Sequence, residues 1–419
     1  MSEQSNIRDK AILVGIAERG SDLPECERSL DELERLLDTA GGSVLARTIQ
    51  IKESFDPRTC IGSGKVREIA DLCAAEEVKL VIFDFELTPA QIRNLEEELG
   101  DVSVIDRSML ILDIFALHAV SGEGKLQVEL AQLKYSAPRL MGKGKDLSRL
   151  GGGIGTRGPG ESKLESDRRH LKEKVNILER RLAELEHNRS VMRAQRDRSG
   201  MTKVAIVGYT NAGKSTLLNY LTGAGVLSED KLFATLDPTT RKLALPGGET
   251  VLLTDTVGFI RKLPHHLVNA FRSTLDEVAY ADILMMVADA TDPELEEHIA
   301  VTLNVIAELG AADKPVIYVY NKCDRLKAMP TLSDERDSVA VSGVTGEGID
   351  RLLSTVEDVI GRFKRKYTLV IPYTDQSSLS AIYNSYSVDS VEYGDEGTVV
   401  TVTLDERGRG TYAKYITHS

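Results

Sequence analysis

The sequence predicts an α/β fold in four successive parts: a parallel α/β domain, an antiparallel helical hairpin, a second parallel-sheet domain and a small α+β domain. Three observations predict it. Apolar runs alternate with helical patterns early in the chain, leucines then recur at heptad spacing, and a glycine-rich loop later joins a buried strand to a helix. We expect the four parts at residues 1–120, 121–198, 201–363 and 367–419.

The N-terminal part has short apolar runs separated by helical patterns, which is typical of a parallel sheet covered by helices. The expected strands are residues 11–15, 43–49, 80–84 and 102–105, and the expected helices are residues 26–40, 64–76 and 88–99. The stretch Ile61-Gly-Ser-Gly-Lys-Val66 leads into one of these helices and could contact a phosphate. Because it lacks a complete phosphate-loop pattern, a helix-capping turn is the alternative.

The second part contains two apolar seams at helical spacing. The first seam is Leu126, Leu130, Leu133 and Ala137, and the second is Leu171, Val175, Leu178, Leu182 and Leu185. The second seam has the spacing of a short coiled coil, so the two helices can pack antiparallel if the chain between them reverses.

A glycine-rich basic stretch, Arg139–Gly160, lies between the seams and contains eight glycines, five basic residues and one acidic residue. Residues 134–198 carry 17 Lys/Arg and 9 Asp/Glu, a local charge of +8 in a chain whose net charge is −13. Glycines allow close approach to a phosphate surface, and the cations could neutralise RNA phosphates. The candidate RNA-binding residues are Lys143, Lys145, Arg149 and Arg157. A flexible solvated linker is the alternative.

The third part begins with Gly208-Tyr-Thr-Asn-Ala-Gly-Lys-Ser215, which matches the pattern G-x-x-x-x-G-K-[ST]. An apolar run precedes it and leucines at helical spacing follow, which is the strand–loop–helix context of a phosphate-binding loop. The backbone N–H groups and the helix N-terminus favour an anion. Lys214 suits the β- and γ-phosphates, and the Ser215 hydroxyl suits Mg²⁺.

Three more motifs follow in the order found in guanine-nucleotide-binding domains. Asp255-Thr-Val-Gly258 ends a strand-like run, where Asp255 can hold Mg²⁺ through water and the N–H of Gly258 can meet a γ-phosphate. Asn321-Lys-Cys-Asp324 ends another run, and the Asp324 carboxylate can accept the two N–H donors on one edge of guanine. Ser342-Gly-Val344 is a weaker match to a loop behind the base. Together the four motifs predict a P-loop GTPase domain that binds GTP and GDP.

The metal-binding threonine of the first switch segment is expected between Phe233 and Thr240. We choose Thr235, which lies twenty residues after Ser215 in a Phe-x-Thr-Leu pattern similar to Obg-type GTPases, with Thr239 as the alternative. The Mg²⁺ ligands are then Ser215 and Thr235, and the residues expected to act in hydrolysis are Lys214, Thr235 and Gly258. The expected nucleotide contacts are Gly208, Tyr209, Thr210, Asn211, Ala212, Gly213, Lys214, Ser215, Thr216, Phe233, Ala234, Thr235, Leu236, Asp237, Asp255, Thr256, Val257, Gly258, Asn321, Lys322, Cys323, Asp324, Ser342, Gly343 and Val344.

Two residues bear on the rate of hydrolysis. Phe259 follows Asp-x-x-Gly where many GTPases place glutamine, and an apolar side chain cannot orient water. We therefore expect slow intrinsic hydrolysis that a partner accelerates. Asn211 suggests that a K⁺ ion does the work of an arginine finger, and stabilisation of the loop turn is the alternative for this residue.

The amino-acid composition indicates the state of the cysteines and the cellular location of the protein. The four cysteines, Cys26, Cys60, Cys73 and Cys323, lack metal-binding or redox spacing, so we expect buried thiols in a reducing compartment. A polar N-terminus and the lack of any long apolar run predict a cytoplasmic protein without a membrane anchor. We expect a monomer. The last part is expected to form strands at 367–373, 390–393, 398–404 and 411–416 and a helix at 377–386.

The chain resembles the HflX family of ribosome-associated bacterial GTPases. The resemblance spans most of residues 50–345. It rests on five segments: Asp56–Lys65, Val104–Arg139, Gly151–Glu161, Phe233–Thr239 and Asp255–Ile260. It implies binding to the large ribosomal subunit and its rRNA, with the glycine-rich loop reaching toward the peptidyl-transferase region. It also implies dissociation of stalled or idle ribosomes when GTP is bound.

The sequence thus favours a GTP-regulated, Mg²⁺-dependent ribosome-splitting factor, and two alternatives stay open. One is an ATP-driven RNA remodelling protein whose nucleotide would bind near Gly62–Lys65. The other is a GTP signalling switch with a protein effector, which would not need the basic loop.

Overall fold

The structure is a computed structural model that describes residues 10–19, 22–140, 159–198, 201–223, 225, 232–233, 236–262, 264, 267, 272–328, 337–386, 388–404 and 406–417. It divides into two compact units, each with its own core. The first unit contains Met1–Glu186, Glu229–Asp237 and Val257–Leu275. The second contains His187–Ser228, Pro238–Thr256 and Asp276–Ser419.

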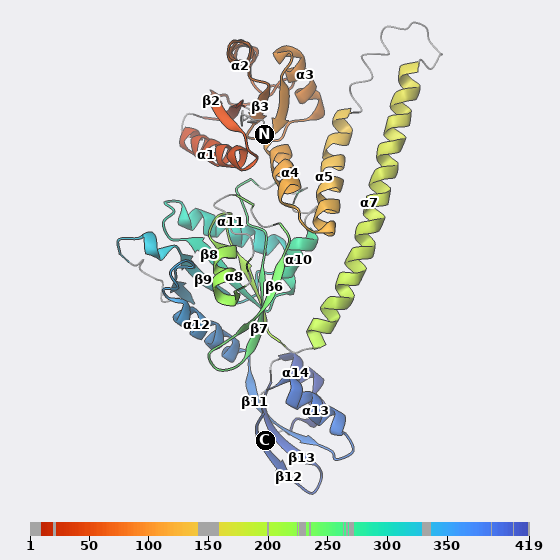
Figure 1. Cartoon of the computed structure of the whole chain (residues 1–419), viewed down its shortest axis with the longest axis vertical. Helices are drawn as coiled ribbons and strands as arrows, with labels where there is room; N and C mark the ends of the chain where they lie inside the picture. The colour runs from red at the N-terminus through yellow and green to blue at the C-terminus, as the bar shows by residue number, and fades with distance from the viewer. Residues whose placement is uncertain are drawn as a thin grey trace, which may run out of the picture. The chain divides into compact units, whose positions relative to one another are not determined.

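The N-terminal domain, in the first unit, is a four-stranded parallel sheet of order β2-β1-β3-β4 with helices between the strands (Figure 1). Its elements are β1 (Lys10–Ala17), α1 (Leu23–Thr39), β2 (Ser43–Ile51), α2 (Ser63–Glu76), β3 (Leu80–Phe83), α3 (Pro89–Leu99), β4 (Ser103–Asp106) and α4 (Arg107–His118). Apolar side chains of β1, β3 and β4 are buried together with those of α2 and α3. This confirms the parallel α/β domain predicted from the alternating pattern.

Local sequence signals explain where two of these helices begin. Thr88 and Gln91 form a capping box at the start of α3, because the Thr88 hydroxyl accepts the Gln91 N–H (3.3 Å) and the Gln91 side chain accepts the Thr88 N–H (2.9 Å). Pro89 then occupies the first turn, where its missing N–H costs nothing. At the end of β4 the Asp106 carboxylate accepts the N–H of Met109 (3.0 Å), so α4 follows the strand directly.

Two helices, α5 (Gly122–Leu140) and α7 (Pro159–Arg198), run in opposite directions (Figure 1). Ion pairs of 2.7 Å join them, from Lys134 to Glu179 and from Lys174 to Glu129. These pairs are exposed and contribute at most about 1 kcal/mol each, so the apolar seam around the buried Leu178 accounts for most of the packing. The helical hairpin is confirmed.

The second unit contains a six-stranded sheet of order β10-β9-β8-β5-β7-β6, in which only the β6–β7 pair is antiparallel. Its elements are β5 (Lys203–Val207), α8 (Lys214–Thr222), β6 (Thr239–Ala244), β7 (Thr250–Asp255), β8 (Ile283–Asp289), α11 (Leu295–Glu308), β9 (Val316–Asn321), β10 (Ser338–Ala340) and α12 (Ile349–Arg362). Because β5, β7, β8 and β9 are parallel, their carboxyl ends lie at one edge of the sheet. Strands β6 and β8 are not among those expected from the sequence.

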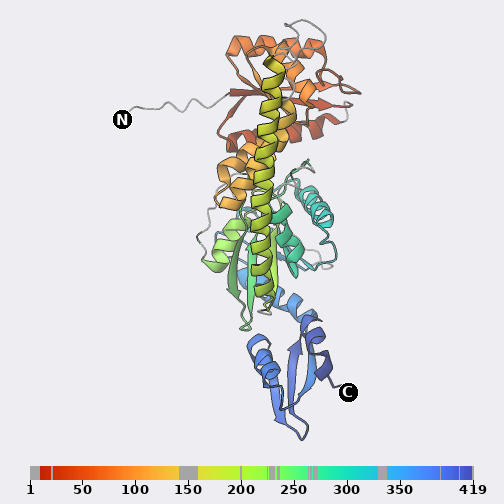
Figure 2. The same cartoon turned by 90° about the vertical axis from the view of Figure 1, so that its right-hand side faces the viewer.

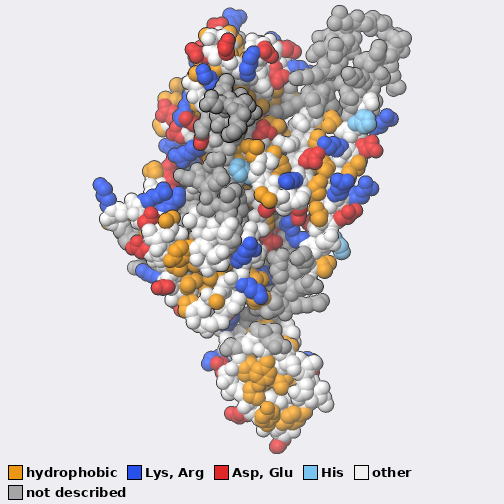
Figure 3. Space-filling model, viewed as in Figure 1, with side chains coloured by type: hydrophobic (Ala, Val, Ile, Leu, Met, Phe, Trp, Pro, Cys, Tyr) orange, Lys and Arg blue, Asp and Glu red, His pale blue; other side chains and the backbone are white. Residues whose placement is uncertain are grey.

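The C-terminal domain is a three-stranded antiparallel sheet of order β11-β13-β12. Its elements are β11 (Arg365–Ile371), α13 (Gln376–Ser385), β12 (Val388–Tyr393), β13 (Thr398–Leu404) and α14 (Glu406–Thr411). Both helices lie against one face of the sheet (Figure 2), and every second residue of β13 is buried there. Hydrophobic side chains also gather on the outer surface of this domain (Figure 3).

The strand expected at residues 411–416 is wrong. The chain instead forms α14 and a 3₁₀ turn at Ala413–Tyr415, and only an isolated bridge joins Ile416 to Leu369. Tyr412 and Tyr415 are both buried in the domain core. Their three-residue spacing places both rings on one side of a helical turn, whereas in a strand they would point to opposite faces.

Candidate nucleotide-binding site

The glycine-rich loop connects β5 to α8 in the conformation that its glycines permit. Gly208 and Gly213 have φ values of +146° and +90°, and Asn211 has φ of +61°. A Cβ at Gly208 would collide with the carbonyl of Val287, so only glycine fits there. Asparagine is among the few other residues that adopt a left-handed conformation readily, which explains why Asn211 is tolerated inside the loop.

Lys214 lies buried under this loop. Its Nζ donates hydrogen bonds to the carbonyl oxygens of Gly208 (3.1 Å) and Tyr209 (2.7 Å). The pKa of Lys214 is lowered to about 8, chiefly by burial; the charge of Asp255 acts in the opposite direction, and the charge of Lys322 contributes to the lowering. The ammonium group therefore has backbone dipoles as its direct partners, and an anionic phosphate would be a stronger one.

Asp255 and Ser215 form the part of the site that suits a metal ion. The Ser215 hydroxyl donates to Oδ2 of Asp255 (2.6 Å). Oδ1 of Asp255 is buried and has no hydrogen-bond partner among the described residues. Burial raises the pKa of the Asp255 carboxyl, while Lys214 and the Ser215 hydroxyl lower it. A carboxylate and a hydroxyl side by side, with one buried oxygen left unbonded, fit a hard cation such as Mg²⁺.

Asn321 and Lys322, at the end of β9, connect the phosphate-binding loop to the segments expected to bind the guanine base. The Asn321 side chain donates to the carbonyl of Ala212 (2.9 Å) and accepts the N–H of Gly343 (2.9 Å). Lys322 Nζ donates to the carbonyl of Asn211 (2.7 Å) and forms an ion pair with Asp289 (2.7 Å). The bonds to the carbonyls of Ala212 and Asn211 span 109 and 111 residues of sequence and hold the loop against the guanine motif.

The residues expected to select guanine lie beside this network. Cys323 is buried, whereas Asp324 is exposed and able to meet a ligand. Ser342 is buried, and its hydroxyl accepts the N–H groups of Val344 (3.3 Å) and Thr345 (3.0 Å), which stabilises the turn that follows β10.

The other predicted site residues lie in the second unit, in the first unit or outside the described residues. Thr256 donates to the carbonyl of Ile206 (2.7 Å) within the second unit. Phe233, Leu236, Asp237, Val257 and Gly258 belong to the first unit and are described there. Ala234 and Thr235 lie outside the described residues, as do the candidate RNA-binding residues Lys143, Lys145, Arg149 and Arg157. The alternative Thr239 lies in β6, opposite Asp255.

Sequence reasoning missed two contributors. Asp289 ends β8 at the same sheet edge as the motifs, and its pairing with Lys322 lowers the pKa of the Asp289 carboxyl against the effect of burial. The apolar run Ile283–Asp289, which ends in a carboxylate, was the signal that could have identified it. His298 of α11 stacks on Tyr209 with ring centroids 3.7 Å apart. That contact joins segments far apart in sequence, and no local pattern indicates it.

The stretch Ile61–Val66 has the contacts of a helix start. The N–H of Gly62, the N-cap of α2, donates to the Gln50 side chain (2.8 Å), and Lys65 pairs with Glu68 (2.7 Å). These contacts support the helix-capping alternative for this stretch.

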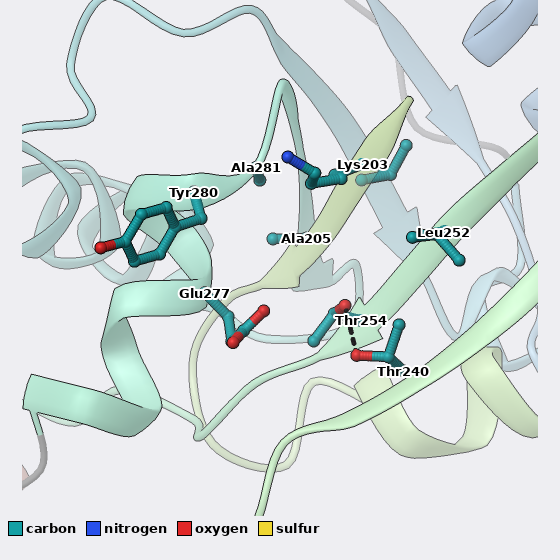
Figure 4. A pocket seen from close by; sticks show the side chains of 9 residues that line it. Lys203, Ala205, Thr240, Leu252, Thr254, Glu277, Tyr280 and Ala281 are labelled. Carbon is teal, nitrogen blue, oxygen red and sulfur yellow. Dashed lines mark hydrogen bonds between the residues drawn. The ribbon is translucent and has the colours of Figure 1, made fainter. Parts of the chain in front are cut away.

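A small pocket lies elsewhere, beside β5 and β7. Thr240 and Thr254 line it with their hydroxyls 2.9 Å apart, together with Lys203, Glu277 and Tyr280 (Figure 4). None of its lining residues belongs to the four motifs, so it is separate from the nucleotide site. All four cysteines are buried and free. Among the described residues, no group of three or more His, Cys, Asp or Glu side chains could hold a metal ion.

The lowered pKa of Lys214 predicts that nucleotide affinity depends on pH. Above about pH 8 the free protein carries a neutral Lys214 amine, which must take up a proton to pair with phosphate. The dissociation constant for GDP should therefore rise about tenfold between about pH 7 and about pH 9. Titration with a fluorescent GDP analogue at these two pH values checks this, and equal affinities would show that Lys214 does not need its charge to bind.

Four protein-family models match successive parts of the chain, in the same order as its domains. The N-terminal region matches a family described as GTP-binding GTPase N-terminal at residues 27–116, and the next region matches GTP-binding GTPase Middle Region at residues 118–196. Residues 203–322 match a family described as 50S ribosome-binding GTPase. Residues 329–411 match the HflX C-terminal domain.

Whole-length relatives agree with this order. The chain is 48% identical to a GTPase HflX of Lacrimispora saccharolytica over 95% of this chain and 94% of that protein. It is 42% identical to GTPase HflX of Escherichia coli over 88% of both chains. A solved GTP-binding protein from Sulfolobus solfataricus, in complex with GDP, is 26% identical with a TM-score of 0.44, over 84% of this chain and 99% of that one. No helix in the described part of the chain is long and apolar enough to cross a membrane.

Proposed function

This chain belongs to the HflX family of GTPases, and from that premise we propose that it binds the large ribosomal subunit and dissociates stalled or idle ribosomes while GTP is bound. Contact with the subunit then stimulates hydrolysis, and hydrolysis releases the protein. The observation that carries this proposal is the 50S ribosome-binding GTPase match, which coincides with the region holding the loop, Asp255 and Asn321. A cytoplasmic, monomeric protein accords with this role.

In this proposal the chain's own residues position the phosphates and select the base. Lys214 exchanges its two carbonyl partners for β- and γ-phosphate oxygens, where its charge offsets the charge of the transferring group. Asn321 and Lys322 fix the position of the phosphate-binding loop relative to the base-binding residues through their hydrogen bonds to the loop carbonyls. The exposed Asp324 carboxylate accepts the N–H donors of guanine, and Gly258 presents its N–H to the γ-phosphate.

A magnesium ion would be held by Ser215 and Thr235, with Asp255 acting through water. When bound, it would neutralise charge on the β- and γ-phosphate oxygens. The unbonded buried oxygen of Asp255 and the adjacent Ser215 hydroxyl support this assignment.

A monovalent cation near Asn211 is the second ion that we propose. The residue lies in the phosphate loop, with an exposed side chain and a left-handed backbone. We expect GTP hydrolysis to be at least about tenfold faster in K⁺ than in Na⁺, a small part of what an arginine finger contributes. Rates in matched K⁺ and Na⁺ buffers, repeated with Asn211→Ala, check this. Equal rates in the two buffers would contradict the ion and leave Asn211 as a residue of the loop turn.

The antiparallel pair of α5 and α7 supports a role for the hairpin in reaching RNA. The helices are joined by ion pairs and an apolar seam, so they form a paired support for the segment that connects them in sequence. We propose that Lys143, Lys145, Arg149 and Arg157, on that segment, contact rRNA phosphates.

Sedimentation of intact ribosomes tests the proposed reaction. Ribosomes incubated with the full chain and a non-hydrolysable GTP analogue should convert from 70S particles to separate subunits, whereas incubation with GDP should leave them intact. The protein should co-sediment with the large subunit. Intact 70S particles under both conditions, with no protein bound, would contradict the proposal.

A further inference from the structure

The segment that connects β8 to α11 contacts the phosphate-binding loop at two points, both within the second unit. At one point the Asp289 carboxylate pairs with Lys322 (2.7 Å), and Lys322 donates to the carbonyl of Asn211 (2.7 Å). At the other point the ring of His298, in the first turn of α11, stacks directly on the ring of Tyr209. The loop is therefore held on this side by one ion pair and one ring contact.

The two rings of the second contact overlap face to face. Their centroids are 3.7 Å apart, their planes are inclined by 12°, and both residues are largely buried. Carbon atoms that are not bonded pack best at about 3.5–4.0 Å, so this centroid distance leaves little offset between the rings. Two neutral aromatic rings disfavour such an overlap because both faces are electron-rich, whereas a cation over the face of tyrosine is attracted. The stacking geometry therefore favours the protonated, positively charged form of His298.

Two carboxylates face the same imidazole ring. Nδ1 of His298 lies 3.2 Å from Oδ2 of Asp292, and Nε2 lies 3.9 Å from Oε2 of Glu294. Oδ1 of Asp292 accepts the N–H of Glu294 (2.9 Å), which fixes the Asp292 carboxylate at the start of α11. A negative charge near each ring nitrogen favours the form in which both nitrogens carry a proton. The ion pairs and the stack thus indicate the same charged form of His298.

Tyr209 connects this ring contact to the phosphate site. Its carbonyl oxygen accepts a hydrogen bond from Lys214 Nζ (2.7 Å), and the carbonyl of Gly208 accepts another (3.1 Å). Lys214 is the residue that we assign to the β- and γ-phosphates, and its ammonium is the charged group that contacts Tyr209 from within the loop. A shift of Tyr209 would move one of the two carbonyls that locate this ammonium. His298 can therefore affect the phosphate site through Tyr209 without touching the nucleotide.

We propose that His298, in its protonated form, is a positioning residue of the nucleotide site that holds Tyr209 and, through it, the part of the phosphate-binding loop that contacts Lys214. Loss of the proton removes the charge from the stack and ends both ion pairs, so the loop becomes less ordered before nucleotide binds. Affinity then falls, because nucleotide binding has to order the loop. GDP and GTP are affected alike, since both contain the β-phosphate that the loop surrounds. The proposal rests on the GTPase activity of the family and does not depend on the ribosome.

The pH dependence of GDP binding tests this in the full chain without ribosomes. Dissociation constants are measured from about pH 5.5 to about pH 9 for the unmodified chain and for His298→Phe, which keeps a ring on Tyr209 but cannot carry a proton. At the lowest pH the unmodified chain should bind GDP about fivefold more tightly than the variant, which is the scale of a partly buried cation–π contact. This advantage should disappear as the pH rises and His298 loses its proton. The titration of Lys214 is common to both chains, so it cancels in the ratio of the two constants.

His170→Phe is the matched control, because His170 lies exposed on α7. The control should bind GDP as the unmodified chain does at every pH. A ratio between the unmodified chain and His298→Phe that does not change with pH would overturn the proposal, since a ring that only packs is replaced equally well at any pH.

A double-mutant cycle at about pH 6 supplies a second test. Tyr209→Leu and His298→Leu should each raise the dissociation constant for GDP by about fivefold, and the double variant should bind about as weakly as either single variant, because both changes remove the same contact. Tyr209→Phe, which keeps the ring, should bind GDP as the unmodified chain does. Additive effects of the two leucine substitutions, which together would weaken binding about 25-fold, would contradict a role for His298 through Tyr209.

Discussion

Replacement of Lys214 by alanine is expected to lower kcat/KM for GTP by about 10²–10³-fold or more, the effect of removing one preorganised group that stabilises transition-state charge. The side chain is buried under the phosphate loop, where its ammonium group has only backbone carbonyls as hydrogen-bond acceptors among the described residues. Without it, the γ-phosphate loses a cation in a site shielded from water, where a charge has a larger effect than at the surface.

Steady-state hydrolysis and nucleotide titration measure this loss. Lys242→Ala is the matched control, because Lys242 lies exposed on β6 of the same sheet. It should leave both the rate and the affinity unchanged. If Lys214→Ala hydrolysed GTP as the unmodified chain does, the phosphate site would have to lie elsewhere in the protein.

Replacement of Asp324 by asparagine is expected to change which base the protein prefers. The Asp324 carboxylate is exposed three residues after Asn321, whose side chain bonds to Ala212 and Gly343, and we expect it to accept both N–H donors of guanine. An amide supplies one acceptor and places a donor against a donor. The affinity for GTP should fall by about 10²–10⁴-fold, because the mismatch leaves polar groups unpaired. Xanthosine triphosphate, with a carbonyl in place of the amino group, should bind the variant better than GTP.

Competition titrations with GTP, ATP and xanthosine triphosphate measure the preference. Asp313→Asn, at an exposed position of the same unit, should keep the original preference for GTP. A variant at Asp324 that still preferred GTP would mean that other groups recognise the base.

The nucleotide site could be predicted from sequence because each motif is short and follows a strand. Gly208–Ser215 follows β5, whereas Asp255 and Asn321 are the last residues of β7 and β9, and parallel pairing brings the ends of these strands to one edge. A local pattern therefore identifies each residue, and the topology alone brings them together. Asp289 was missed because β8, the apolar run that this carboxylate ends, was not among the strands expected from the sequence.

The contacts of the switch segments could not be predicted in the same way. Arg107 reaches Asp84 and Arg261, and Asp237 reaches Ser121, across intervals of 23 to 154 residues. Their chemistry is that of ordinary ion pairs and helix caps, which occur throughout any chain. Only the folded first unit shows that these particular residues meet.

The wrong prediction of a strand at residues 411–416 has a simpler cause. The segment Thr411-Tyr-Ala-Lys-Tyr-Ile416 is rich in aromatic and β-branched residues, whose propensity favours a strand. Burial of Tyr412 and Tyr415 in one core requires helical spacing, and this tertiary contact outweighs the local preference.

The central claim is that the large ribosomal subunit stimulates this GTPase through the hairpin. GTP hydrolysis by the full chain should be measured with and without purified large subunits, alongside a variant that lacks Gly142–Gly160. The account predicts stimulation by about 10²-fold or more in the full chain, since partners that complete a GTPase site act on this scale. The variant should keep its basal rate and lose the stimulation. Equal rates with and without subunits in both proteins would contradict the account and remove the ribosome from it.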